Sequence, residues 1–268
     1  MCGIYGSTRI YEDEVVKSKL KNMDFRGPDN SEFKLINNEI ILGHNRLSII
    51  DLNHRSNQPF EYYHLTITFN GEIYNYKELK EQLVKQGLSF RTESDTEVIV
   101  ASYLKYGSKC VEKFNGMFSF VIYDKNKREF FGARDRFGQK PFFYTLINNS
   151  FEFCSQLSSI VINNNFSIDN DSLCQYLQWD YIPEPNTIYK DINKLEAGYT
   201  FKYDLKNKAF IKEKYWDLNY SKIENKVYDY QTTKEKLDNY IRDSIKIRMN
   251  SDVPLGVFLS GGIDSSLI

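Results

Sequence analysis

From Gly3 to about Tyr203, most of the chain consists of short runs in which apolar and polar residues alternate. In the clearest run, apolar residues at 65, 67 and 69 alternate with threonines, and the run stops at Asn70-Gly71, a pair typical of turns. Two further runs, residues 117–123 and 129–133, flank a polar turn at 124–127 and predict a hairpin. This period of two predicts strands of antiparallel sheets.

Segments with helical spacing interrupt these strands. Residues 76–85 form one such segment, which ends before Gly87, and residues 95–106 form a second, which follows Ser94, a residue type suited to the N-cap. Residues 172–179 predict a third helix. The mixture of helices and antiparallel strands predicts one α+β domain over residues 1–218.

The pattern changes after Trp216. Residues 219–230 are charged and weakly patterned, which predicts a linker, and a helix follows with Leu237, Tyr240 and Ile245 on one face. The apolar run 254–259 is typical of a buried parallel strand, which needs neighbouring strands and covering helices. We therefore expect residues 231–268 to be the opening of a second domain.

Charge and hydropathy narrow the classes of partner. Lysine and arginine total 35 against 36 acidic residues, so the net charge is −1 and gives no basic field for nucleic acid or anionic membrane. No run approaches the ~18 consecutive apolar residues of a membrane span. The N-terminus lacks a basic segment followed by an apolar core, so we expect a cytoplasmic protein that acts on small molecules.

The four cysteines are too few and too scattered for a disulfide framework or a metal site of closely spaced pairs. Cys110, Cys154 and Cys174 are predicted to be small core side chains. Cys2 is different because removal of Met1 would place a free α-amine, with a pKa of about 7.7–8, beside its thiol. Taken alone, Cys2 fits either an activated nucleophile or an ordinary cysteine near a chain terminus.

Other segments also allow a chemical and a structural interpretation. An asparagine amide and a glycine N–H at Asn70-Gly71 suit an oxyanion hole, although the pair also suits a turn. Arg46 suits bidentate capture of a carboxylate, or it is an edge-strand arginine in water. Residues 94–97 open a helix, and the turn-like segments 26–29 and 133–138 carry charges that we expect to pair with one another.

Residues 260–266, Ser-Gly-Gly-Ile-Asp-Ser-Ser, follow the predicted strand and open toward a helix. Backbone N–H groups and serine hydroxyls in such a loop can bind phosphate groups. The segment lacks the lysine of a Walker A loop, and a plain turn between strand and helix is the alternative.

Taken together, these motifs resemble glutamine-hydrolysing asparagine synthetase. They are collinear and spread over almost the whole chain: Met1-Cys2-Gly3-Ile4, residues 26–29, 43–51, 69–76, 94–97, 116–118 and 260–266. The resemblance implies a class II glutamine amidotransferase with a four-layer αββα N-terminal-nucleophile fold. The first helix, strand and phosphate loop of an α/β ATP-pyrophosphatase domain would follow.

The resemblance also implies roles for individual residues. Cys2 would be the nucleophile, and Asn70 and Gly71 would form the oxyanion hole. The residues that would bind the glutamine α-carboxylate are Arg46, Leu47, Ser48, Ile49 and Ile50. Glu72 and Asp95 would bind the α-amine, and glutamine hydrolysis would need no cofactor.

In the family, the ammonia passes to a second domain that adenylates aspartate with Mg-ATP. The residues of this chain that match its nucleotide loop are Leu259, Ser260, Gly261, Gly262, Asp264 and Ser265, with Asp264 near magnesium. The aspartate-binding segments have no match in the sequence, so we expect glutamine hydrolysis but no asparagine formation by this chain. A homodimer is compatible with the resemblance.

Three alternatives stay open. The acceptor of the ammonia is another carboxylate, such as a sugar uronate or a β-lactam precursor; the chain is a non-catalytic glutamine-binding remnant; or it is an N-terminal-nucleophile peptidase or acylase. The full set of chemically capable residues argues against a remnant. Arg46 opposite two carboxylates favours free glutamine over an internal peptide residue.

Overall fold

Two six-stranded antiparallel sheets form the centre of the part of the chain that the computed structural model describes, residues 1–220 and 229–268. The first sheet has the strand order β10-β8-β9-β1-β3-β2, and the second has the order β12-β11-β7-β6-β5-β4. The strands of the first sheet are β1 (Gly3–Ser7), β2 (Asn30–Ile36), β3 (Ile40–Arg46), β8 (Phe143–Ile147), β9 (Ser150–Cys154) and β10 (Ile192–Lys194). Those of the second are β4 (Phe60–Tyr62), β5 (Leu65–Ile73), β6 (Gly116–Asp124), β7 (Glu129–Arg134), β11 (Tyr199–Asp204) and β12 (Ala209–Lys214).

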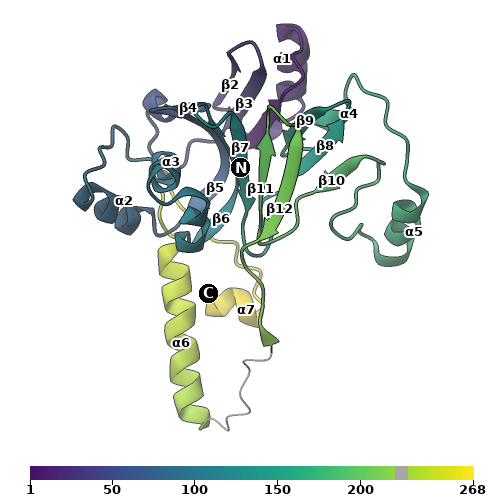
Figure 1. Ribbon diagram of the computed structural model, residues 1–268. Coiled ribbons are helices and arrows are strands. Elements are labelled where there is room, and N and C mark those ends of the chain that lie inside the picture. The colour runs from purple at the N-terminus through teal and green to yellow at the C-terminus, as the bar shows by residue number, and fades with distance from the viewer. Residues whose placement is uncertain (221–228) are drawn as a thin grey trace.

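Helices cover the outer faces of the two sheets (Figure 1). The α-helices are α1 (Asp13–Lys21), α2 (Tyr76–Lys85), α3 (Asp95–Tyr106), α4 (Ser158–Val161), α5 (Asn170–Trp179), α6 (Tyr230–Ile247) and α7 (Ile263–Leu267). Short 3-10 helices lie at Asp24–Arg26, His54–Ser56 and Gly107–Lys113. In this described part, no helix combines the length and hydropathy needed to span a bilayer.

The alternation of side chains along each strand explains the layers. On β6, Phe120 and Ile122 pack with α2 and α3, whereas Val121 and Tyr123 pack against residues of the first sheet. The outer face of the first sheet packs on α1 and α4. The order is therefore helices, sheet, sheet, helices, as predicted. The central strands are buried on both faces, whereas the edge strands β2 and β12 are partly exposed.

The polar positions of β5 up to Asn70 are buried as well as the apolar ones. Thr68, on the polar side of the alternation, is fully buried, and its hydroxyl donates to the carbonyl of Gly43 in the first sheet at 3.1 Å. The prediction that the strand stops at Asn70-Gly71 is wrong. β5 continues to Ile73, because β6 pairs with it along its whole length, up to Ile73 opposite Gly116.

Most of the other local predictions are confirmed. The β6–β7 hairpin and the bounds of α2 and α3 are as predicted, and the Ser94 hydroxyl accepts the N–H of Thr96. α5 begins two residues earlier than expected, because Asp169 caps it through the N–H of Ser172. Cys110 and Cys154 are buried as predicted, but Cys174 is exposed, since it lies on a face of α5 without a packing partner in the core.

The C-terminal segment differs from the prediction. Residues 221–228 of the predicted linker lie outside the described residues, and its last residue belongs to α6, which Asp229 caps. Residues 254–259 form no strand, and Phe258 is fully exposed. A parallel strand requires a hydrogen-bonded neighbour, and the described residues supply none for this segment. The turn at 260–262 and the helix after it are as predicted.

Candidate active site

A pocket of about 200 Å³ lies over the start of β1, where β3, β5 and the beginning of α3 converge. It brings together residues that lie far apart in the sequence. Its lining residues are Met1, Cys2, Arg46, Leu47, Ile49, Ile50, Ser56, Gln58, Phe69, Asn70, Gly71, Glu72, Ser94, Asp95, Thr96, Met117 and Lys140. Every residue predicted for the glutamine site is present except Ser48, whose N–H instead donates to the Asp29 carboxylate at 2.7 Å.

Cys2 is one of the residues that line this pocket. Its Sγ accepts the N–H of Leu47 at 3.4 Å and lies 3.7 Å from the Leu47 carbonyl. The Arg26 guanidinium donates to the Cys2 carbonyl at 3.0 Å and fixes the backbone. Burial raises the pKa of the Cys2 thiol, and the Leu47 N–H opposes this effect only in part. With Met1 in place, the thiol is therefore protonated at neutral pH.

The side chain of Asn70 is fully buried, and neither its oxygen nor its nitrogen has a hydrogen-bond partner among the described residues. Buried amides are almost always paired, and leaving one unpaired costs about 1–3 kcal/mol. The next residue, Gly71, has φ +155°, and a Cβ there would lie 2.1 Å from the Met117 carbonyl oxygen. The β5–β6 pairing thus requires glycine at position 71. The Asn70 amide beside it is available to a ligand.

Two carboxyl groups face the same pocket. Asp95 is buried at the start of α3, and its carboxylate accepts the N–H of Ile73 at 3.0 Å. Burial, reinforced by the nearby Glu72, raises the pKa of Asp95 to about 7, even though the Ile73 hydrogen bond opposes the shift. Burial also raises the pKa of Glu72. A bound cation would relieve the cost of keeping both groups ionised.

Arg46 lies at the end of β3 and is only 5% exposed, which excludes the interpretation as an edge arginine in water. Its guanidinium donates to the carbonyls of Ile50, Asp51 and Asn53 and to the Asn57 side chain. It therefore shapes the loop of residues 47–57, which we call the pocket loop, and brings a positive charge to the pocket wall.

Comparison with known proteins assigns this arrangement to a family. The family model described as "Glutamine amidotransferase domain" matches residues 1–216. The chain belongs to this family. A second family model, "Asparagine synthase", matches residues 236–268.

Curated relatives of this chain include several glutamine-hydrolysing asparagine synthetases, which confirms the resemblance stated from the sequence. A putative asparagine synthetase 2 of Methanocaldococcus jannaschii is 40% identical over an alignment of 296 residues. This alignment covers 100% of this chain and 56% of that protein. Asparagine synthetase 1 of Bacillus subtilis is 38% identical and is covered to 43%. The chain thus spans about half the length of the curated relatives it matches.

A solved structure of glutamine phosphoribosylpyrophosphate amidotransferase from B. subtilis, complexed with ADP and GMP, has the same fold. Its TM-score is 0.58 at 17% sequence identity, and the match covers 81% of this chain and 50% of that one. At this identity the likeness supports the fold alone. It agrees with the two antiparallel sheets and helical layers of the amidotransferase domain.

Sequence reasoning missed Lys140 as a member of the amidotransferase pocket. Its ammonium lies 2.8 Å from the Met1 sulfur, and burial lowers its pKa. The loop that carries it is built around the Asp135 carboxylate, which accepts the N–H groups of Lys140 and Phe137. The signal in the sequence that could have identified Lys140 is its position as a charged residue just after the turn 133–138.

The charges of the two turn-like segments do not pair internally, contrary to expectation. Arg26 contacts the Cys2 carbonyl, and Asp29 contacts the Ser48 N–H. Arg134 pairs with Glu184 and with backbone carbonyls. These charges instead bind backbone N–H and C=O groups, two of which belong to the pocket residues Cys2 and Lys140.

The loop at residues 260–266 is separate from this pocket, and none of its residues lines it. The Ser260 and Ser265 hydroxyls lie 2.8 Å apart, and the Ser260 hydroxyl accepts the N–H of Gly262 at 3.4 Å. Gly261 has φ +77°, with open space around it. Exposed hydroxyls and glycine N–H groups are donors suited to a phosphate, so these residues fit such a group chemically. Within the described residues, no cluster of three His, Cys, Asp or Glu side chains suits a metal ion.

Proposed function

We propose that this chain hydrolyses glutamine at Cys2. The observation that carries the proposal is one pocket that holds a thiol, a buried amide without a partner at Asn70, a pair of carboxyl groups and an arginine. Each of these groups matches one part of glutamine: the side-chain carbonyl carbon, its oxygen, the α-amine and the α-carboxylate. The family membership of the domain supports the same reaction class.

The reaction would proceed through a covalent intermediate. The Cys2 thiolate attacks the side-chain amide carbon of glutamine, and the developing oxyanion is stabilised by the Asn70 amide and the Gly71 N–H. The C–N bond breaks as the leaving nitrogen gains a proton, so ammonia departs and a glutamyl thioester remains. Water then attacks the thioester, which releases glutamate and restores the thiol.

The charges around the pocket orient the substrate. Asp95 and Glu72 bind the ammonium of glutamine, and Arg46 together with the pocket-loop backbone binds its carboxylate. An internal peptide residue carries neither of these charges, so the same groups disfavour a peptidase.

Removal of Met1 is part of this proposal. The Met1 side chain lines the pocket beside Cys2, so its loss would open space for substrate. Removal also gives Cys2 an α-amine with a pKa of about 7.7–8, which can take the proton of the thiol near neutral pH. The amine thereby compensates for the burial that raises the pKa of the thiol.

We infer further that the ammonia serves ATP-dependent amidation of aspartate in proteins of the full length of the relatives. The nucleotide-loop match with the asparagine synthase family supports this inference. Ser260, Gly261, Gly262 and Ser265 would hold the phosphates of ATP next to Leu259, and Asp264 would face Mg²⁺. ATP would activate the aspartate carboxylate. Amidation of another carboxylate and a cytoplasmic location stay predictions from the sequence.

Glutamine-dependent ammonia release tests the proposal directly. The processed wild-type chain should release ammonia and glutamate in equal amounts, and Cys2→Ala should release neither above background. Nα-acetylglutamine, which lacks the α-ammonium, is the control substrate and should react poorly. Equal rates for wild type and Cys2→Ala would refute hydrolysis at Cys2, and preference for the acetylated substrate would favour the acylase alternative.

A further inference from the structure

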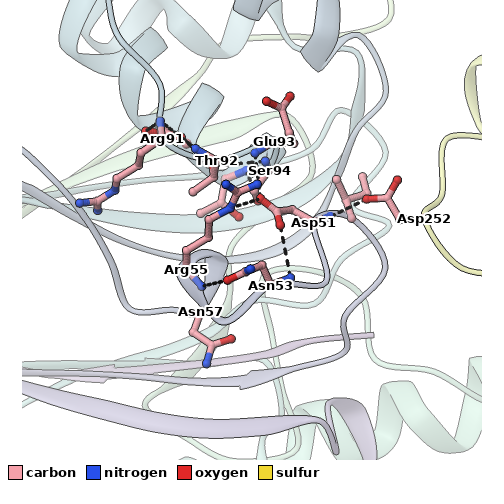
Figure 2. Close-up of polar contacts among 12 residues, drawn as sticks. Asp51, Asn53, Arg55, Asn57, Arg91, Thr92, Glu93, Ser94 and Asp252 are labelled. Atoms are coloured by element: carbon pink, nitrogen blue, oxygen red, sulfur yellow. Dashed lines mark hydrogen bonds and ion pairs between the residues drawn. The ribbon is translucent and has the colours of Figure 1, made fainter.

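The segment that follows α6 contacts the pocket loop (Figure 2). The Asp252 carboxylate accepts the N–H of Asp51 at 2.7 Å, and the Asp252 N–H donates to the Ile49 carbonyl at 2.9 Å. Asn250 adds a hydrogen bond from its side chain to the Tyr74 carbonyl at 3.2 Å. Asp252 thus forms hydrogen bonds with the backbone of the residues before and after Ile50, a pocket-lining residue.

The backbone at Asp51 needs such support. Asp51 has φ +48°, in the left-handed region that costs a non-glycine residue about 1 kcal/mol or more. Its carboxylate accepts the N–H of Glu93 at 2.8 Å and pairs with Arg55 at 3.2 Å. Burial alone would raise the pKa of Asp51, but these hydrogen bonds outweigh it and the pKa is lowered, so the group is ionised at neutral pH.

None of these contacts involves the Asp51 N–H, which donates to Asp252. Glu93 and Arg55 bind the Asp51 side chain, and Arg46 binds its carbonyl, whereas Asp252 binds its N–H. Asp252 lies in the segment matched by the asparagine synthase family model, outside the matched amidotransferase region. The pocket loop is therefore held in part by a residue from the second matched segment.

We propose that Asp252 is a positioning residue for the glutamine pocket, so that the segment leading to the nucleotide loop completes the glutamine site. This inference rests on the proposed glutaminase function. Asp252 acts through the backbone of residues 49–51 and does not line the pocket. The Cys2 end of the loop is anchored separately by the hydrogen bond from Ser48 to Asp29. Loss of Asp252 should therefore weaken glutamine binding and spare the chemical step.

Kinetics of three variants of the full chain test this role. Asp252→Ala should raise KM for glutamine by about five- to tenfold, the effect of losing one typical hydrogen bond, with kcat within about twofold of wild type. Asp252→Asn keeps an oxygen that can accept the Asp51 N–H and should restore KM to within about twofold. Asp243→Ala removes an exposed carboxylate from α6 and is the matched charge control; it should change neither parameter.

Hydrogen exchange separates failure of this inference from failure of the proposed function. In Asp252→Ala, amides of residues 49–53 should exchange faster than in Asp243→Ala, whether or not glutamine is a substrate. An inactive wild-type chain would refute the glutaminase function, with the exchange result still deciding whether Asp252 holds the loop. Unchanged KM and unchanged exchange in Asp252→Ala would overturn the positioning role, as would a fall in kcat at constant KM.

Discussion

Replacement of Asp95 by asparagine should stabilise the protein at neutral pH while it weakens glutamine binding. Burial and the neighbouring Glu72 raise the pKa of Asp95 from 3.8 to about 7 in the folded state. The native state therefore binds this proton more tightly than the unfolded state does, and stability falls as the pH rises from about 3.8 to 7. Because of this rise in pKa, ionisation of Asp95 in the folded state lowers the free energy of unfolding by about 4 kcal/mol.

An asparagine at position 95 carries no such cost. Its oxygen can still accept the Ile73 N–H, and its nitrogen can donate to the Ser94 hydroxyl, which lies 3.5 Å from the present carboxylate. The unfolding free energy of Asp95→Asn relative to wild type should therefore grow by about 2–3 kcal/mol between pH 5 and pH 8. For a chain of this size that is a gain in relative Tm of about 5–10 °C.

Thermal unfolding at pH 5, 6, 7 and 8 measures this difference, with the exposed Asp243→Asn on α6 as control. Loss of the charged partner for the glutamine amine should at the same time raise KM by about ten- to a hundredfold. A Tm difference that stays the same between pH 5 and pH 8, or an Asp95→Asn protein that is less stable at pH 8, would refute the raised pKa.

Three further predictions concern the same pocket. Asn70→Ala should lower kcat by about 10²–10³ with little change in KM, because its amide acts on the oxyanion; a change in KM alone would contradict that role. Gly71→Ala should cost about 1–3 kcal/mol of stability, because its Cβ would meet the Met117 carbonyl, and an unchanged Tm would contradict the strained geometry. In the inactive Cys2→Ala chain, the calorimetric Kd for glutamine should rise about tenfold per pH unit below pH 7, because Asp95 must lose its proton to bind the ammonium; a flat Kd would contradict this.

The sequence was sufficient for much of the fold because local signals and packing agree. The Ser94 cap and the turn after β6 are strong local signals, and the helices and hairpin they predict are present. The continuation of β5 through Asn70-Gly71 was not predictable in this way, since it depends on pairing with β6 across a long sequence separation. The run 254–259 shows the reverse case: its composition favours a strand, but a strand forms only where a neighbour supplies hydrogen bonds.

The candidate site was predicted residue by residue only after the motifs were taken together. Each motif alone also suited a purely structural role, such as a turn, a helix start or an edge-strand arginine, and what decides between the alternatives is distance in space. Contacts between distant segments determine three features of the site. These are the unpaired Asn70 amide, the pocket position of Lys140 and the hydrogen bonds of Asp252 to the pocket loop. No local periodicity encodes such contacts.

Hydrolysis of glutamine at Cys2 is tested most sharply by the site at which a glutamine-like diazoketone becomes attached to the chain. Peptide mapping by mass spectrometry would locate the adduct, with and without glutamine as protectant. If Cys2 is the nucleophile, a single adduct forms on Cys2 in chains that have lost Met1, and glutamine suppresses its formation. An adduct on Cys174, or no adduct in a chain that releases ammonia from glutamine, would contradict hydrolysis at Cys2.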